Sequence, residues 1–200
     1  EMCIRDRSPM LSKKGKLYGD LTVSCISENH FMVYGSGAAQ EMHRRWFEQH
    51  LDQYEVIYKN RSDDYHGLAI SGPKSRNLLQ LLVREDVSNE SFKFRDSRQM
   101  FVAGVTALVN RLSFTGELGY EIYVAPHYQI KLYEAIEDAG EEFNIKPFGG
   151  RALMSMRLEK NWGAWTLDFR PDYTPKETGL SAFINWDKDF IGKDLSLIHI

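Results

Sequence analysis

Residues Asn110 to Val124 read NRLSFTGELGYEIYV, and the predicted fold of the chain is built outward from this stretch. Residues suited to a strand lead into residues 115–119 (TGELG), after which residues 120–124 alternate between apolar and polar positions. Two strands joined by a glycine-bearing loop predict a β-hairpin. Glu121 lies inside the second, aromatic strand, where a carboxylate must face water, a partner or a ligand.

The acidic residues of this hairpin have two interpretations. Glu121 and the loop residue Glu117 are compatible with the solvated outer face of an ordinary hairpin. Alternatively, a carboxylate beside aromatic rings and a close backbone turn holds a flat, polar, nitrogen-rich ligand. Spacing alone leaves both interpretations open.

The composition is that of an ordinary globular protein. The chain has 200 residues, of which 42% are hydrophobic and 26% charged, and its net charge is -3. This length is ample for a buried core. The charge gives no electrostatic reason to expect nucleic acid or an anionic membrane as a partner. No apolar run is long enough to span a bilayer.

The two ends of the chain share an unusual coding relation. Residues 2–7 (MCIRDR) are encoded by the DNA string ATGTGTATAAGAGACAG followed by a purine, and residues 195–200 (LSLIHI) by its reverse complement. The string resembles a transposon-end tag used in sequencing libraries, so we interpret residues 1–9 and 195–200 as sequencing scars. We therefore discount Cys3, expect residues 1–7 and 195–200 to lack specific packing, and interpret the chain as an internal fragment.

Periodicity predicts strands and helices in alternating groups. The expected strands are residues 20–26, 30–34, 54–58, 67–70, 100–112, 120–124 and 179–186, and the expected helices are residues 38–51, 73–82, 127–139 and 151–160. Residues 161–178 show no regular period. Hairpins combined with single helices predict an α+β fold with mixed, largely antiparallel sheets and packed helices.

The sequence contains none of the short motifs that commonly indicate a catalytic or metal site. It contains no HExxH, CxxC or GxSxG pattern and no GxGxxG after a strand, and its histidines are far apart, so no metal site is expected. Cys25 falls in a predicted strand and is read as a core residue. Asp20, at a strand start, is compatible with a turn-side acid. Arg151, at a helix start, is compatible with a surface ion pair or with binding a ligand carboxylate.

Several ordered motifs resemble the folate-binding aminomethyltransferase family, which includes the glycine cleavage T-protein. These are GKLYGDLTV at residues 15–23, GPKS at 72–75, RLSFTGELGYEIYV at 111–124 and GGRALMSMRLEK at 149–160. Residues 157–194 look like the C-terminal half of dimethylglycine and sarcosine dehydrogenases. The resemblance covers residues 10–194, which we predict to be one folate-binding domain in fragment form.

The resemblance implies a role for five residues. The family's folate-site aspartate falls on Asp20, which would act in catalysis on the cofactor amines. Glu121 would accept hydrogen bonds from the pterin ring, and Arg151 matches the family's arginine after the glycines. Phe114 stands where the family has a tyrosine, so stacking survives but the hydroxyl hydrogen bond is lost. An aromatic site of the family falls near Phe94. We predict that Asp20, Glu121 and Arg151 approach one pocket lined by aromatic side chains, including Phe114.

The implied activity is the capture of a one-carbon unit from an N-methyl amine as methylenetetrahydrofolate. In such enzymes FAD is bound by an N-terminal half, and this chain has no dinucleotide-binding fingerprint of its own. Two rival hypotheses are a stand-alone glycine cleavage T-protein and a folate-binding module without transferase chemistry. The resemblance implies that the protein is located in a bacterial cytoplasm or in a mitochondrial matrix.

Overall fold

The computed structural model describes residues 5–198, which form two compact units. The four-stranded unit comprises Arg61–Trp162 together with Ile26–Glu28, and the three-stranded unit comprises Arg5–Cys25, Asn29–Asn60 and residues 163–198. Helices packed on antiparallel sheets confirm the predicted α+β class. None of the helices in the described part of the chain has the length and apolar character needed to cross a membrane.

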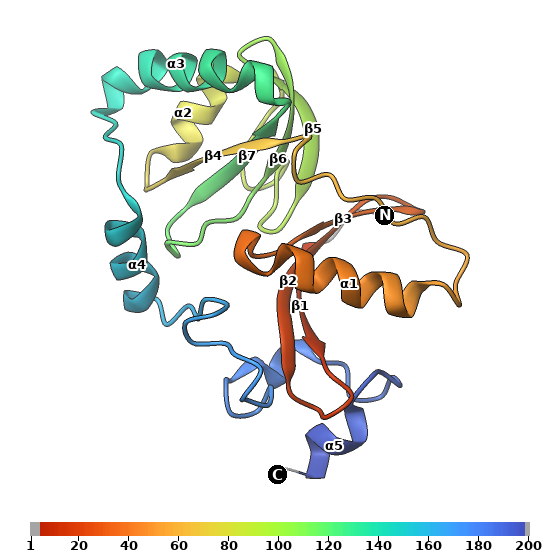
Figure 1. The fold of residues 1–200 in the computed structure, drawn as a ribbon. Helices are drawn as coiled ribbons and strands as arrows, with labels where there is room; N and C mark the ends of the chain where they lie inside the picture. The colour runs from red at the N-terminus through yellow and green to blue at the C-terminus, as the bar shows by residue number, and fades with distance from the viewer. Residues whose placement is uncertain (1–4, 199–200) are drawn as a thin grey trace. The chain divides into compact units, whose positions relative to one another are not determined.

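The four-stranded unit contains a sheet that two of its helices cover on one face. The strand order is β4-β7-β6-β5, with all neighbours antiparallel. Helices α2 and α3 cover one face of this sheet (Figure 1). The elements are β4 (His66–Ser71), α2 (Ser75–Leu82), β5 (Ser97–Val102), β6 (Val105–Asn110), β7 (Gly119–Val124), α3 (Gln129–Gly140) and α4 (Gly150–Glu159).

The predicted hairpin is present as β6 and β7. Its register places Val109 opposite Ile122, and both side chains are fully buried against the helices. Because successive side chains of a strand point to opposite faces, Asn110 and Glu121, the next pair in the register, lie on the other face of the sheet. The alternation seen in the sequence therefore does separate a core face from a second face that carries Glu121.

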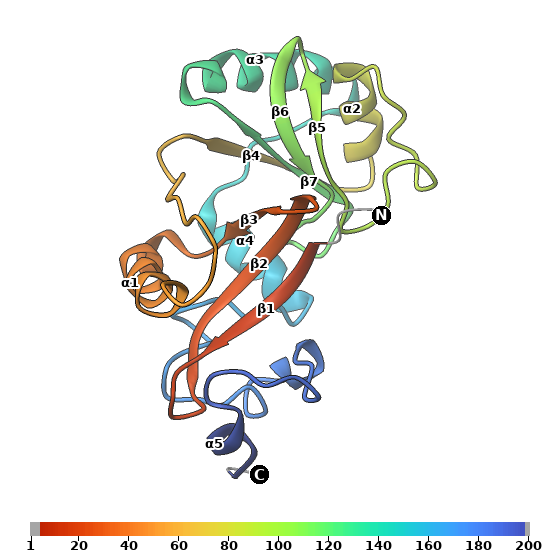
Figure 2. The same cartoon turned by 90° about the vertical axis from the view of Figure 1, so that its right-hand side faces the viewer.

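One predicted strand is two strands. Residues 100–112 read as a single β-branched run, but β5 and β6 form a second hairpin that turns at Ala103 and Gly104 (Figure 2). Both turn residues have positive φ, 50° and 76°. A two-residue turn of this kind matches the right-handed twist of the flanking strands. Alanine is an uncommon residue at positive φ, so the turn signal was weak in the sequence.

Two other predictions of secondary structure were wrong. Residues 54–58 alternate like a strand but form none, and Ile57 is fully exposed. Residues 179–186 contain a short 3-10 helix, Leu180–Phe183, instead of a strand. The helix predicted after Pro73 is confirmed as α2, which begins at Ser75 and ends at Leu82. In the first two cases the alternation has no partner strand, and strand propensity depends on such packing.

The three-stranded unit packs a sheet against irregular chain. Its elements are β1 (Arg5–Leu11), β2 (Leu17–Ser27) and β3 (His30–Tyr34) in the order β1-β2-β3, helix α1 (Gln40–Leu51) and helix α5 (Lys193–Ile198). Its core residues are Leu11, Leu17, Ala39, Trp165, Phe169 and Leu180. Residues 161–178 lack regular helices or strands, as predicted. A Cβ at Gly163 would lie 2.0 Å from the Phe169 ring, so this position requires glycine.

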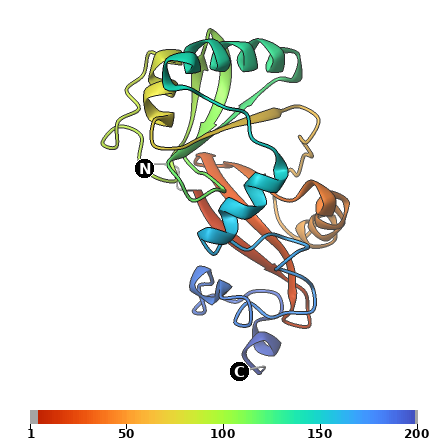
Figure 3. The same cartoon turned by 90° about the vertical axis from the view of Figure 1, so that its left-hand side faces the viewer.

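The expectation that both chain ends lack packing was wrong for the residues that the structure describes. Arg7 lies in β1, and α5 lies beside the β1–β2 turn (Figure 3). Ser196 is only 2% exposed, and a Cβ at Gly15 would come within 2.3 Å of its backbone nitrogen. Residues 1–4 and 199–200 are outside the described residues. The scar hypothesis, which concerns the DNA, stays a prediction.

His43 makes the stability of the three-stranded unit sensitive to pH. The ring is 5% exposed, its Nε2 lies 3.1 Å from the Tyr18 carbonyl oxygen, and it contacts the Trp165 ring. Burial lowers the pKa of His43 below its usual 6.5, and the hydrogen bond to Tyr18 opposes this only in part. The unfolded chain therefore binds the proton more readily, and stability is lost as pH falls below about 6.5.

We expect His43→Gln to flatten this pH dependence, because the amide keeps a donor for Tyr18 but does not titrate. Urea unfolding between pH 7.5 and 5.5 measures the effect. His30→Gln, at an exposed position of the same unit, should keep the wild-type slope. Equal slopes in the wild type and His43→Gln would contradict the assignment.

Candidate functional site

Glu121 lies on the face of the four-stranded sheet that helices α2 and α3 leave uncovered. It pairs with Asn110 of β6 on one side and with Ala69 of β4 on the other. The Tyr123 hydroxyl, two residues along the same strand face, donates a hydrogen bond to Glu121 Oε2 at 3.1 Å. Gly67, opposite Tyr123, leaves room for that ring, since a Cβ there would lie 2.8 Å from it. The half-buried carboxylate is thus oriented rather than free to move.

The loop that carries Phe114 is held by a chain of hydroxyl groups. Ser71 Oγ lies 2.9 Å from Ser113 Oγ, which lies 2.7 Å from Thr115 Oγ1. Thr115 Oγ1 in turn accepts from the Glu117 backbone N–H at 3.3 Å. Phe114 is half-buried in this loop, directly before the Glu121 strand. The sequence did not indicate the hydroxyl chain, because Ser71 is distant from its partners along the chain.

Helix α4 is attached to the same loop. Lys160, which follows the helix, forms an ion pair with Glu117 at 3.3 Å and fills the space over Gly116. Arg157 is 4% exposed and donates to the Trp162 carbonyl oxygen at 2.7 Å, so it is a structural residue rather than part of a solvated face. Arg151, one residue after the start of the helix, is exposed, and its guanidinium forms no hydrogen bond or ion pair within residues 5–198.

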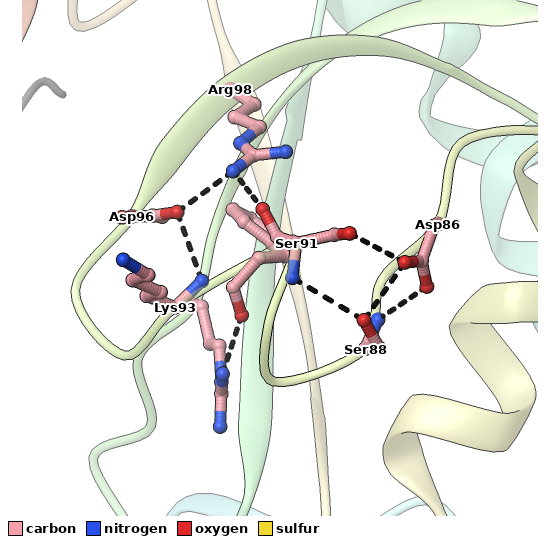
Figure 4. Close-up of polar contacts among 8 residues, drawn as sticks. Asp86, Ser88, Ser91, Lys93, Asp96 and Arg98 are labelled. Atoms are coloured by element: carbon pink, nitrogen blue, oxygen red, sulfur yellow. Dashed lines mark hydrogen bonds and ion pairs between the residues drawn. The ribbon is translucent and has the colours of Figure 1, made fainter.

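Phe94 lies in the loop between α2 and β5. Figure 4 shows the hydrogen bonds and the ion pair among its neighbours between Asp86 and Arg98. Asp96 is 8% exposed and accepts from the Lys93 backbone N–H at 2.9 Å and from Arg98 at 3.0 Å. Asp86 accepts from the Ser91 hydroxyl, and this bond is the main cause that lowers the pKa of Asp86. The Phe94 ring itself is 60% exposed. The loop therefore presents an aromatic face to solvent on a fixed support.

Asp20 belongs to the three-stranded unit, in β2. Arg7 binds its carboxylate through two hydrogen bonds, Nε to Oδ1 at 2.8 Å and Nη2 to Oδ2 at 2.6 Å. The Arg7 guanidinium also lies over the rings of Phe169 and Phe183, 5.0 and 5.7 Å from their centroids. Asp20 is thus an oriented strand residue rather than a turn-side acid. Arg7 itself falls in the predicted scar, residues 1–9.

The structure places four of the five predicted site residues in one unit. Glu121, Phe114, Phe94 and Arg151 belong to the four-stranded unit, and Asp20 belongs to the other. The prediction that Asp20, Glu121 and Arg151 share one pocket stays a prediction. Within the described residues, no group of three or more histidine, cysteine, aspartate or glutamate side chains is placed to hold a metal ion.

Three comparisons relate this chain to known proteins. A family model described as the GCVT N-terminal domain matches residues 7–188. The human mitochondrial dimethylglycine dehydrogenase is 40% identical over 191 residues, which is 93% of this chain and 22% of that protein. The aminomethyltransferase of Thermoanaerobacter pseudethanolicus is 35% identical over 190 residues, 94% of this chain and 51% of that protein.

The fold has a counterpart among solved structures. The glycine cleavage system aminomethyltransferase T from Bartonella henselae superposes with a TM-score of 0.84 and 20% identity, over 99% of this chain and 53% of that one. At this identity the match describes the fold alone. The chain spans about half the length of the aminomethyltransferases it matches, 51%, and 22% of the dimethylglycine dehydrogenase.

Proposed function

We propose that this chain, which belongs to the folate-binding aminomethyltransferase family, is part of a larger FAD-dependent enzyme. It is the portion that transfers the one-carbon unit, and the enzyme is similar to dimethylglycine or sarcosine dehydrogenase. The observation that carries the proposal is the 40% identity with human dimethylglycine dehydrogenase, against 35% with the aminomethyltransferase of T. pseudethanolicus over nearly the same residues. Mouse dimethylglycine dehydrogenase is 38% identical to this chain, which is also higher than the 35% identity with that aminomethyltransferase.

The residues of the four-stranded unit fit the chemistry of a reduced folate. The pterin ring presents adjacent N–H donors, and the oriented Glu121 carboxylate offers two acceptor oxygens. Phe114 supplies an aromatic surface beside that strand, and the exposed Arg151 guanidinium matches a carboxylate of the folate tail. Tetrahydrofolate supplies, when bound, the two amines that take up a one-carbon unit.

The role of Asp20 in this proposal is that of a general base. Two amines of the folate would bond to the one-carbon unit; an iminium donor would leave as the demethylated amine with release of a proton, whereas formaldehyde would lose its oxygen as water, and each route would pass through a cationic centre. A carboxylate nearby stabilises the cation and accepts the proton. The oxidation that produces the one-carbon unit would occur at a flavin bound elsewhere in the parent protein, with an N-methyl amine as substrate.

A stand-alone glycine cleavage T-protein is the second candidate function. It is favoured by the 35–36% identity with several bacterial aminomethyltransferases. The two candidates differ in the donor of the one-carbon unit, which is an N-methyl amine in the first and an aminomethyl group on a lipoyl carrier in the second.

The complete protein that contains this domain separates the two candidates. It is given tetrahydrofolate with either dimethylglycine and sarcosine or an aminomethyl-loaded lipoyl carrier protein. We expect methylenetetrahydrofolate from the free amines, with reduction of the flavin. Product formed only from the loaded carrier would replace the proposal with the T-protein function.

Glu121→Gln should weaken tetrahydrofolate binding in the complete protein. The amide keeps the shape of the side chain but loses the charge-assisted hydrogen bond, which corresponds to about 1–3 kcal/mol and so to a rise in Kd of roughly 5- to 150-fold. Anaerobic titration calorimetry measures the change. Glu134→Gln, an exposed position on α3, is the matched control and should bind as the wild type does. If both variants bind equally well, Glu121 does not hold the ring.

A further inference from the structure

Asn110 carries a buried polar group that the fold itself does not use. It is the last residue of β6 and is 0% exposed. Its Oδ1 accepts a hydrogen bond from Ser97 Oγ at 2.6 Å, whereas its Nδ2 has no hydrogen-bond partner within the described part of the chain. Buried polar atoms are nearly always satisfied, so an unsatisfied one calls for a reason.

The residue that carries the unused donor is the register partner of Glu121. The two residues are directly opposite each other in the β6–β7 register, where Cβ atoms are about 4.5–5.5 Å apart. Ser97, Asn110, Glu121 and Ala69 form one row across the four strands, on the face away from α2 and α3. Ser97 fixes the amide at one end of this row and Tyr123 fixes the carboxylate. The row therefore presents two acceptor oxygens next to one donor.

This order of groups is complementary to one edge of a 2-amino-4-oxo-pterin. That edge carries an exocyclic amine, a ring N–H and a carbonyl oxygen in sequence, which is donor, donor and acceptor. A carboxylate pairs with the two donors, and an amide N–H₂ pairs with the carbonyl oxygen. No other side chain of the row can donate there, since Ala69 has no polar atom and the Ser97 hydroxyl donates to Asn110.

We propose that Asn110 is a specificity-determining residue of the ligand site, and that its Nδ2 donates a hydrogen bond to the 4-oxo group of the pterin ring beside Glu121. The inference rests on the proposed function, because it takes a reduced folate as the ligand. It adds a preference that Glu121 alone does not explain. A site with this donor accepts a 4-oxo ring and rejects a 4-amino ring, which would place two donors against each other.

The test compares two ligands and three proteins. Tetrahydrofolate and its 4-amino-4-deoxy analogue are titrated anaerobically into the complete wild-type protein, Asn110→Leu and Gln99→Leu. Gln99 is an exposed amide on the same sheet face, two register pairs away along β5. Each protein is also unfolded thermally without ligand.

We expect the wild type and Gln99→Leu to bind tetrahydrofolate at least tenfold more tightly than the 4-amino analogue. Asn110→Leu should bind tetrahydrofolate about 10- to 100-fold more weakly, because the ring carbonyl loses its donor, and should lose the preference between the two ligands. Its thermal midpoint is recorded as well, because leucine removes the unsatisfied buried donor but also the acceptor of the Ser97 hydroxyl. If leucine at this position prevents folding, Asn110→Thr is used with the same two ligands.

Different experimental results would overturn this inference and the proposed function. A wild-type protein that binds neither ligand overturns the proposed function. A wild type that binds tetrahydrofolate, together with an Asn110→Leu variant that binds it equally well, overturns only the role of Asn110. Tighter wild-type binding of the 4-amino analogue also overturns it, because the amide oxygen and nitrogen would then face the ligand in exchanged positions.

Discussion

Asp20→Asn is expected to reduce methylenetetrahydrofolate formation by the complete enzyme about 10²–10⁴-fold, the usual contribution of general acid–base catalysis. The amide preserves the shape of the side chain and part of its hydrogen bonding, but it removes the negative charge and the basicity. Flavin reduction by the amine should stay near the wild-type rate, because oxidation does not involve this carboxylate. Formaldehyde should therefore accumulate in place of the folate product.

The measurement follows amine consumption, folate product and formaldehyde in parallel. Asp172→Asn removes an exposed carboxylate from the same three-stranded unit and is the matched control. The thermal midpoint is recorded as well, because Asp20→Asn also weakens the ion pair with Arg7. A variant that forms the folate product at the original rate would show that Asp20 is a structural strand residue only.

Phe92→Ala should lower the free energy of unfolding of the four-stranded unit by about 3–5 kcal/mol. The ring is 0% exposed and stacks on Tyr120, with centroids 5.9 Å apart and planes 20° from parallel. The Arg98 guanidinium lies over the same ring at 5.0 Å, so truncation removes a cation–π contact together with the packing.

Urea denaturation of the full chain measures this loss. Phe101→Ala removes the same side chain from a position in β5 that is 64% exposed, so it should change stability by less than about 0.5 kcal/mol. Equal losses in the two variants would contradict the assignment of Phe92 to the core of this unit.

The parts of the fold that could be predicted from sequence are those in which local pattern and tertiary partner agree. The hairpin around residues 111–118 combines alternating strands with a glycine-bearing loop, and β6 and β7 pair as that pattern requires. Residues 54–58 show equal alternation, yet they have no neighbouring strand and stay irregular. The Ala103–Gly104 turn was missed because alanine rarely adopts the positive φ that the turn needs.

The residues of the candidate site could be predicted only in part from their spacing in the sequence. Spacing drew attention to Glu121, but the roles of Asp20, Arg151, Phe114 and Phe94 came from a resemblance that covers most of the chain. Family membership supports that resemblance, while the five roles stay predictions. The unsatisfied amide of Asn110 could not have been predicted, because it depends on the register of three strands and on burial.

The fate of the one-carbon unit tests the central claim most directly. The complete enzyme is given ¹³C-methyl-labelled dimethylglycine with and without tetrahydrofolate, and labelled products are quantified by NMR. We predict that the label appears mainly in methylenetetrahydrofolate when the folate is present and in free formaldehyde when it is absent. Label that goes to formaldehyde in equal amounts under both conditions would contradict the claim that this domain captures the one-carbon unit.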